Sequence, residues 1–180
     1  SKSKGNTINP DDIVETVGAD ALRVYEMFMG PFDQAIAWST DNLVGARRFL
    51  ERVERASGNL GESSLSKELE VLMHQTIKKV SADIEELKMN TAISSLMIFL
   101  NALEKEKEVS REGYQVLLQL LAPFAPHLTE ELWERIGNKG SVHTELWPVF
   151  DEGKTTLDTV TIAISVNGKV RGEVSVSRGA

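Results

Sequence analysis

Apolar residues recur every three or four positions along most of the chain, which is the period of an amphipathic α-helix. In the stretch 40–57 the apolar positions fall on one arc of a helical wheel: Leu43, Ala46, Phe49, Leu50 and Val53. A second long run follows, with apolar residues at Leu69, Met73, Ile77, Val80, Ile84 and Leu87. Both stretches are therefore predicted as helices whose apolar side packs on a core, with Thr40 or Asp41 capping the first.

Glycine, proline and short polar residues divide the remaining chain into further helices. Asn9-Pro10 favours a helix start, and Gly30-Pro31 favours a helix end. Helices are predicted up to about residue 16 and over 20–29, 90–103 (capped by Asn90-Thr91), 110–121 and 126–137, with a loop at 58–64. Four or five of these helices are expected to pack as an antiparallel bundle.

The period changes from helical to strand-like near the C-terminus. Apolar residues alternate over 160–166, Asn167-Gly168 is a preferred type I′ turn, and a partner strand is predicted over 169–176. A hairpin alone is marginally stable in water, so these strands are expected to begin another module. The predicted fold class is mainly α: an antiparallel helical bundle with a C-terminal β-hairpin starting a small second domain.

Composition is that of an ordinary globular chain. Its 180 residues, 41% hydrophobic and 26% charged, can bury a core. The absence of cysteine excludes disulfides and thiolate metal sites and is typical of a reducing compartment. No apolar run is long enough to span a bilayer, and no signal sequence stands at the start. We therefore expect a cytoplasmic protein without membrane contact.

The sequence contains no self-contained catalytic set. The three histidines, His74, His127 and His143, share no metal-ligand spacing. A Gly-x-Ser-x-Gly elbow, a dinucleotide-binding glycine pattern and a Walker motif are all missing. Neither a metal site nor an independent enzyme is predicted from these patterns.

Three cationic stretches remain, although the net charge of -7 argues against a protein that is basic all over. The first is 1–6, where lysine charge, serine hydroxyls and a glycine suit a phosphate group. A frayed terminus is the alternative. The last one along the chain is the hairpin segment 167–172, which contains Lys169 and Arg171. All three stretches could face one polyanion.

The second cationic stretch is a stripe of arginines within the helix predicted over 40–57. Arg48, Arg52 and Arg55 recur at i, i+4 and i+7, and Arg47 flanks them. A solvated helix face with Arg–Glu pairs produces this spacing. A surface that contacts a phosphate backbone produces it as well, and both interpretations stay open at this point.

Several segments resemble the class I aminoacyl-tRNA synthetases, and bacterial leucyl-tRNA synthetases in particular. SKSKGN at 1–6 resembles the tail of the KMSKS signature without its first Lys and Met. The longer matching segments are GADALRVYEMFMGPFDQAIAWST at 18–40, GARRFLERV at 45–53, NTAISSLM at 90–97, LLAPFAPHLTEELW at 120–133 and VNGKVRG at 166–172. The resemblance covers almost the whole chain.

The resemblance implies a role for the first residues in a catalytic loop beside ATP. Lys2 matches the second lysine of the signature and would stabilise charge on pyrophosphate while leucine is adenylated. Ser1 and Ser3 would shape the loop, and Lys4 would assist. ATP with Mg²⁺ is thus the cofactor expected for the parent enzyme, and none is expected to stay bound to this chain alone.

The resemblance also implies that the bundle binds the body of a leucine-accepting tRNA. The candidate tRNA-facing residues are Trp38, Arg47, Arg48, Arg52, Arg55, Lys169 and Arg171. For Trp38, packing inside the domain is the alternative to a platform for a base.

Taken with the resemblance, the sequence predicts three regions and a monomer. These are a signature loop with a helical stem at 1–30, an anticodon-binding-type bundle at 31–147, and a linker with the start of a C-terminal tRNA-binding domain at 148–180. The HIGH signature, the nucleotide-binding sheet and the editing domain of the family are missing, so the chain is expected to be an inactive fragment of a leucine–tRNA ligase. Valyl, isoleucyl or methionyl enzymes, or a non-enzymatic helical interaction module, are the alternatives.

Overall fold

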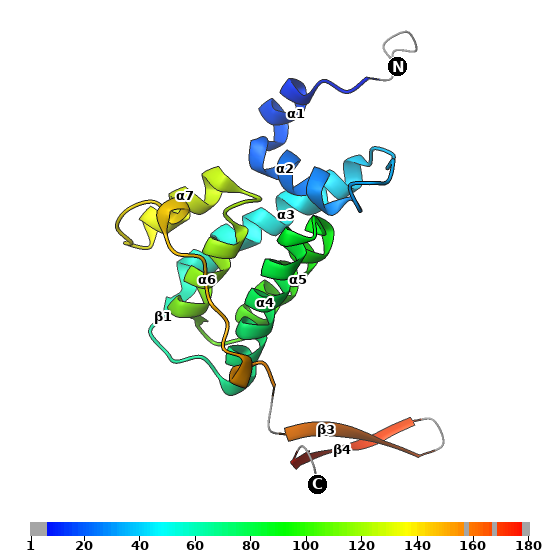
Figure 1. The fold of residues 1–180 in the computed structure, drawn as a ribbon, viewed down its shortest axis with the longest axis vertical. Coiled ribbons are helices and arrows are strands. Elements are labelled where there is room, and N and C mark those ends of the chain that lie inside the picture. The colour runs from blue at the N-terminus through cyan, green and yellow to red at the C-terminus, as the bar shows by residue number, and fades with distance from the viewer. Residues whose placement is uncertain (1–6, 157–158, 167–168, 178–180) are drawn as a thin grey trace.

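The computed structural model describes residues 7–156 in full and the backbone of residues 159–166 and 169–177. Most of the described residues lie in seven α-helices (Figure 1). Their bounds are α1 (Pro10–Val17), α2 (Ala19–Phe28), α3 (Thr40–Ala56), α4 (Lys67–Glu85), α5 (Met89–Leu103), α6 (Arg111–Leu121) and α7 (Pro126–Arg135). The predicted mainly helical fold is confirmed.

Short polar residues begin several of these helices, as their preference for the N-cap requires. The Asn9 side chain accepts from the backbone N–H of Asp11, and Ser110 accepts from Gly113. Ser39, rather than Thr40 or Asp41, caps α3 by accepting from the N–H of Asn42. The predicted cap was therefore wrong by one or two residues, because Thr40 already lies in the first helical turn.

The helices share one hydrophobic core. α4 packs along α5, α5 also packs against α2 and α6, and α6 packs against α7. Phe99 of α5, Tyr114 of α6 and Phe124 after α6 are almost fully buried at the centre. Val24 and Tyr25 of α2 belong to the same core, so the stem helix α2 is part of this packing unit.

Two local predictions fail at chain reversals. Leu87 was expected on the buried side of α4, but α4 ends at Glu85 and Leu87 is 61% exposed with a φ of 58°. A three-and-four spacing continues through a turn as easily as through a helix, so the pattern could not show where the helix stops. α5 then begins at Met89, before the predicted Asn90-Thr91 cap, and the Thr91 hydroxyl instead donates to the Asp83 carboxylate at 2.7 Å.

The short strands β1 (Leu60–Gly61) and β2 (Val109–Ser110) pair in parallel. They tie the segment after α3 to the segment before α6, and the sequence analysis did not predict them. Two-residue strands are too short to show an alternating pattern. Short 3₁₀ turns complete the irregular segments: η2 (Ser57–Asn59), η3 (Val142–Thr144) and η4 (Glu152–Lys154).

The segment between α7 and the hairpin crosses the bundle and is held to α4 (Figure 1). The Trp147 indole N–H donates to the Ser81 hydroxyl at 2.8 Å, and the backbone N–H of Asp151 donates to His74 at 3.1 Å. Gln75 donates to the carbonyl of Thr155 at 2.7 Å. These bonds fix the path of the chain up to Thr155.

The predicted hairpin is confirmed as β3 (Thr159–Val166) and β4 (Lys169–Ser177), which pair antiparallel. The register pairs Ile162 with Val174 and shifts between Ile164 and Ser165. The proposed turn residues Asn167 and Gly168 lie outside the described residues. Among the helices described, none has the length and apolar character that a bilayer crossing demands.

Candidate nucleic-acid interface

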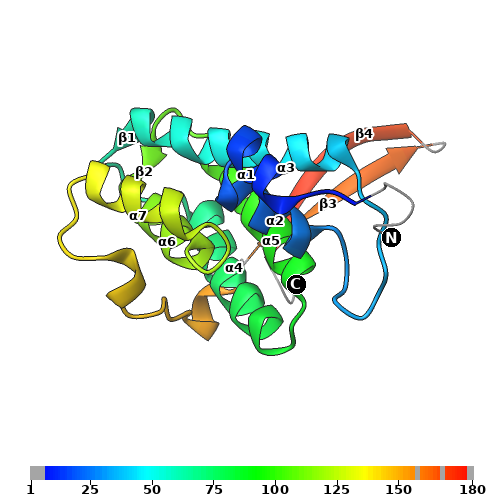
Figure 2. The ribbon, with the colours of Figure 1, turned by 90° about the horizontal axis from the view of Figure 1, so that it is seen from above.

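Helix α3 runs along one side of the bundle (Figure 2); α2 packs against it, and the end of α1 reaches it through the contact between Arg47 and Thr16. Its inner face is formed by buried residues: Leu43, Ala46, Phe49, Leu50, Val53 and Ala56. Its outer face carries exposed side chains, among them Val44, Arg48 and Arg55. The arginines predicted as a stripe therefore do lie on the exposed side of this helix, but the structure divides them into two kinds.

The side chains of Arg48 and Arg55 have no hydrogen bond or ion pair with any residue of the described part of the chain. They lie seven residues apart on the same helix face, about 10.5 Å along the axis at 1.5 Å per residue. An arginine fork that its own chain leaves unsatisfied can bind a phosphate or a carboxylate with two parallel hydrogen bonds. The Arg–Glu pairs of the solvated-face interpretation are therefore not formed by these two side chains, which are exposed.

Arg47 points to the α1 side of α3. Its Nε donates to the Glu51 carboxylate at 2.9 Å, and its Nη1 donates to the carbonyl of Thr16 at 3.4 Å. The first contact is the i,i+4 pair that the sequence offers, and both side chains are about half exposed. The pair leaves part of the Arg47 guanidinium open, while the Thr16 contact joins α3 to the end of α1.

Arg52 leans to the opposite edge of α3, toward the C-terminal end of α5. Its guanidinium pairs with the Glu104 carboxylate and donates to the Asn101 side chain at 2.5 Å. The Arg52 side chain is 32% exposed. Glu104 is separated from Arg52 by 52 positions, so this partner could not be found from helix spacing, which relates only neighbours on the same helix.

Trp38 is half-buried just before α3, and its ring meets the ring of Tyr25 edge to face at a centroid distance of 4.8 Å. Its indole N–H donates to the Thr40 hydroxyl at 3.3 Å. The Tyr25 hydroxyl in turn accepts from the backbone N–H of Ser39 at 2.8 Å. Packing therefore accounts for one side of Trp38, while the rest of the ring lines a pocket between α2 and α3.

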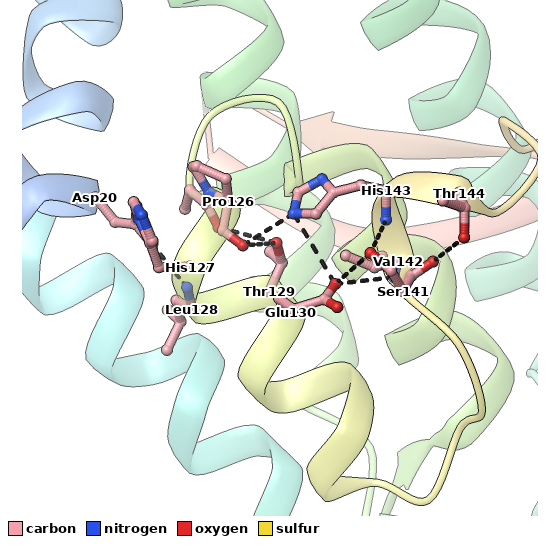
Figure 3. A network of polar contacts seen from close by, with 11 residues as sticks. Asp20, Pro126, His127, Leu128, Thr129, Glu130, Ser141, Val142, His143 and Thr144 are labelled. Atoms are coloured by element: carbon pink, nitrogen blue, oxygen red, sulfur yellow. Dashed lines mark hydrogen bonds and ion pairs between the residues drawn. The ribbon is translucent and has the colours of Figure 1, made fainter.

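Two charged residues of α2 serve the fold rather than a ligand. Asp20 accepts from the backbone N–H of Leu128 at 2.7 Å and from His127 at 2.8 Å (Figure 3). Arg23 donates to the carbonyls of Pro123 at 2.8 Å and Phe124 at 3.3 Å. The turn between α6 and α7 leaves these backbone groups without helical partners. The sequence analysis did not predict this joint; the prolines that break the helix were the only signal.

The three histidines each have a separate structural partner. His74 contacts the N–H of Asp151. Figure 3 shows the other two: His127 contacts Asp20, and His143 lies 3.1 Å from the carbonyl of Pro126. Nearby, Glu130 accepts from the Ser141 hydroxyl and the Val142 N–H. Within the described residues, no group of three His, Cys, Asp or Glu side chains could hold a metal ion.

The remaining candidates cannot be placed as side chains. Ser1, Lys2, Ser3 and Lys4 lie outside the described residues, so their ATP-related roles stay predictions. Lys169 and Arg171 lie in β4, where only the backbone is described. Arg171 falls at the register shift, because its neighbours on either side pair with consecutive residues of β3.

A family model named "Anticodon-binding domain of tRNA ligase" matches residues 66–180, well over half of the chain. The chain belongs to this family. Its fold is also similar to that of a leucyl-tRNA synthetase (LeuRS, agnB2) of Agrobacterium radiobacter K84, solved as a ternary complex described as LeuRS-tRNA-LeuAMS. The TM-score is 0.82 with 29% sequence identity, over 100% of this chain and 26% of that one. This domain of a tRNA ligase thus spans about a quarter of the synthetase it matches.

Proposed function

We propose that this anticodon-binding domain is the tRNA-binding part of a leucine–tRNA ligase and that the outer face of α3 contacts the tRNA phosphate backbone. The observation that carries the proposal is the pair of exposed arginines, Arg48 and Arg55, that lack partners within the described chain. Long cationic side chains without intramolecular acceptors contribute little to folding. On a domain of this family, a polyanionic partner accounts for them.

The other arginines contribute in a secondary way. Arg47 and Arg52 each keep a carboxylate partner, Glu51 and Glu104, at the two edges of the helix. A phosphate can use the open side of either guanidinium, which presents five donors in all. Arg47 and Arg52 are therefore proposed to support the contact that Arg48 and Arg55 make, and Lys169 and Arg171 to extend it along the hairpin.

The binding test uses the 180-residue chain and purified tRNA. Arg48→Ala is expected to weaken tRNA binding about tenfold, because it removes a charge-assisted hydrogen bond to phosphate. Lys78→Ala is the matched control, since it removes one positive charge from α4, where Lys78 pairs with Glu152. Equal affinities of Arg48→Ala and the Lys78→Ala control would remove the basis of the proposal.

The leucine specificity is supported by the sequence segments that resemble leucyl enzymes and by the 29% identity to one of them. The runner-up is the equivalent domain of a valyl, isoleucyl or methionyl enzyme. A longer protein that contains this chain is expected to attach leucine, and not valine, isoleucine or methionine, to tRNA. Charging with one of the other three amino acids would refute the leucine assignment.

In such a parent enzyme, ATP with Mg²⁺ would supply the adenylate, and Lys2 would stabilise the charge that develops on the leaving pyrophosphate. Ser1, Ser3 and Lys4 would complete that loop. The 180-residue chain alone is expected to give no leucine-dependent exchange of ATP and pyrophosphate, whereas the parent should lose that exchange when Lys2→Ala is introduced. From the resemblance to leucyl-tRNA synthetases, the parent enzyme is also proposed to be a monomer in the cytoplasm.

A further inference from the structure

A pocket of about 320 Å³ opens on the segment that joins α2 to α3. Five of its lining side chains carry the argument: Tyr25, Glu26, Phe32, Gln34 and Trp38. The volume lies at the lower end of the range for small-molecule sites. Such a pocket suits a single small planar group better than a long apolar side chain or a helix.

Aromatic rings are concentrated here. The whole chain has six Phe, three Trp and two Tyr residues, and three of these eleven rings, Tyr25, Phe32 and Trp38, line this one pocket. Phe32 is 57% exposed, although a phenyl ring without a partner is disfavoured in water. The exposed ring is therefore available to stack on a ligand.

The part of the pocket wall formed by Tyr25 and Trp38 is held in place by other contacts. Tyr25 is 2% exposed and packs edge to face on Trp38. The Trp38 indole N–H and the Tyr25 hydroxyl are both engaged, by Thr40 and Ser39. A planar group entering the pocket thus meets a fixed aromatic wall and needs little rearrangement of the protein.

Two polar side chains at the pocket are left unused by the fold. Glu26 is exposed, and neither its carboxylate nor the Gln34 side-chain amide bonds to any residue in the described part of the chain. Together they present acceptors and an amide donor, as the Watson–Crick edge of a base requires. The negative charge of Glu26 disfavours a phosphate and favours a base with an exocyclic amino group over uracil.

The pocket lies near the proposed phosphate contacts. Trp38 is two residues before α3, and Arg48 is eight residues into the helix, about 12 Å along its axis at 1.5 Å per residue. Nucleotides stacked at about 3.4 Å each cover that distance in three to four steps. A strand whose phosphates reach Arg48 can therefore turn one of its bases toward the pocket.

We infer that this pocket binds one unpaired base of the tRNA, of the amino-bearing kind (cytosine, adenine or guanine), by stacking on Phe32 and hydrogen bonding to Glu26 and Gln34. The inference rests on the proposed tRNA-binding function and names a second kind of contact for it. The outer face of α3 holds the phosphate backbone. The pocket selects a base that is not paired.

The test measures tRNA binding by the 180-residue chain at several salt concentrations. Phe32→Ala is expected to weaken binding about tenfold, within the range for removing one stacked base, without changing the salt dependence, because no charge is removed. Phe32→Trp should restore binding, since it keeps a ring for stacking. The control is Ile98→Ala, which removes a similarly exposed apolar side chain from α5 (Ile98 is 56% exposed) and should have no effect.

Base preference is tested with cytidine and uridine hexanucleotides as probes. The wild-type chain is expected to prefer the cytidine hexamer about tenfold, and Glu26→Gln should reduce this preference to less than threefold. Equal binding of the two hexamers by the wild-type chain would overturn the assignment of an amino-bearing base.

The two proposals fail in different ways. If Arg48→Ala weakens tRNA binding and Phe32→Ala does not, the pocket inference is wrong and the proposed function stands; a protein segment would then be the occupant to seek. If Phe32→Ala weakens binding and Arg48→Ala does not, the pocket stands and the role of the α3 face falls. If neither variant matters, both proposals are overturned.

Discussion

The two faces of α3 satisfy their polar and charged groups differently. On the inner face, Leu43 and Phe49 are buried, and even the carbonyl of Val53 accepts an additional hydrogen bond from the Tyr114 hydroxyl at 2.8 Å. On the outer face, Arg48 and Arg55 lack partners in the described part of the chain. Stability and binding are thus carried by opposite sides of one helix, so that single substitutions should separate them.

The edges of α3 show the intermediate case. Arg47 and Arg52 are cationic like their neighbours, yet each has a carboxylate within reach. Residue type alone therefore does not identify a binding residue. What separates these arginines is whether the fold supplies a hydrogen-bond acceptor. The Arg23 side chain has such acceptors and joins α2 to the turn after α6. The side chains of Arg48 and Arg55 on the outer face have none in the described part of the chain.

The largest effect is expected on the inner face. Phe49→Ala should lower the free energy of unfolding by about 3–5 kcal/mol, because it removes a buried ring and leaves a cavity in the core. Urea denaturation followed by circular dichroism measures this. Val44→Ala, at an exposed position of the same helix, is the control; a similar destabilisation there would contradict the division into two faces.

The outer face should show the opposite behaviour. Combining Arg48→Glu with Arg55→Glu is expected to raise the Kd for tRNA about 100-fold, because two attractive interactions become repulsive. The free energy of unfolding should stay within about 0.5 kcal/mol of wild type, as is usual for surface changes without partners. Binding isotherms and urea denaturation of the same samples decide the matter, and a large decrease in stability would show that these side chains serve the fold.

A pH effect is expected on the inner face. Burial raises the pKa of Tyr114 above its ordinary value of 10. Above about pH 10 the hydroxyl ionises in the unfolded chain while it stays protonated in the folded one. The contribution of the Tyr114 hydroxyl to the free energy of unfolding is therefore complete below pH 10 and falls as the pH rises further, by up to about 1.4 kcal/mol per pH unit. Tyr114→Phe should lack this part of the pH dependence, which denaturation of both chains from pH 8 to 11 would reveal.

The smallest effect is expected at an edge. Glu104→Gln removes the carboxylate that holds Arg52, so the guanidinium becomes available to phosphate and tRNA binding should tighten about two- to fivefold. The cost in stability should be under about 1 kcal/mol, as for other partly exposed pairs. Weaker tRNA binding by this variant would mean that Glu104 positions Arg52 for the phosphate instead of competing with it.

Helix positions followed from the sequence because burial imposes a period on it. The apolar arc of α3, and Pro126 at the first position of α7, predict both helices within a few residues. The joints between helices could not be predicted in the same way. The pairs Asp20–Leu128 and Arg23–Pro123 join residues about a hundred positions apart, and periodicity contains no information on such contacts.

The candidate site was predictable to the same extent. Spacing placed Arg48, Arg52 and Arg55 on one side of a helix; the structure places Arg48 and Arg55 on its exposed side and Arg52, partly buried, at an edge. The difference between Arg52 and its neighbours depends on Glu104, the residue just after α5, which only the fold reveals. The pocket beside Trp38 depends equally on the path of the chain between α2 and α3.

The salt dependence of tRNA binding tests the central claim most directly. Removing one arginine that neutralises a phosphate should reduce the slope of log Kd against log salt concentration by about 0.7–0.9. Replacing both Arg48 and Arg55 by alanine is therefore expected to lower the slope by about 1.4–1.8 relative to the wild-type chain. An unchanged slope, with the double variant folded, would show that the outer face of α3 does not contact the tRNA backbone.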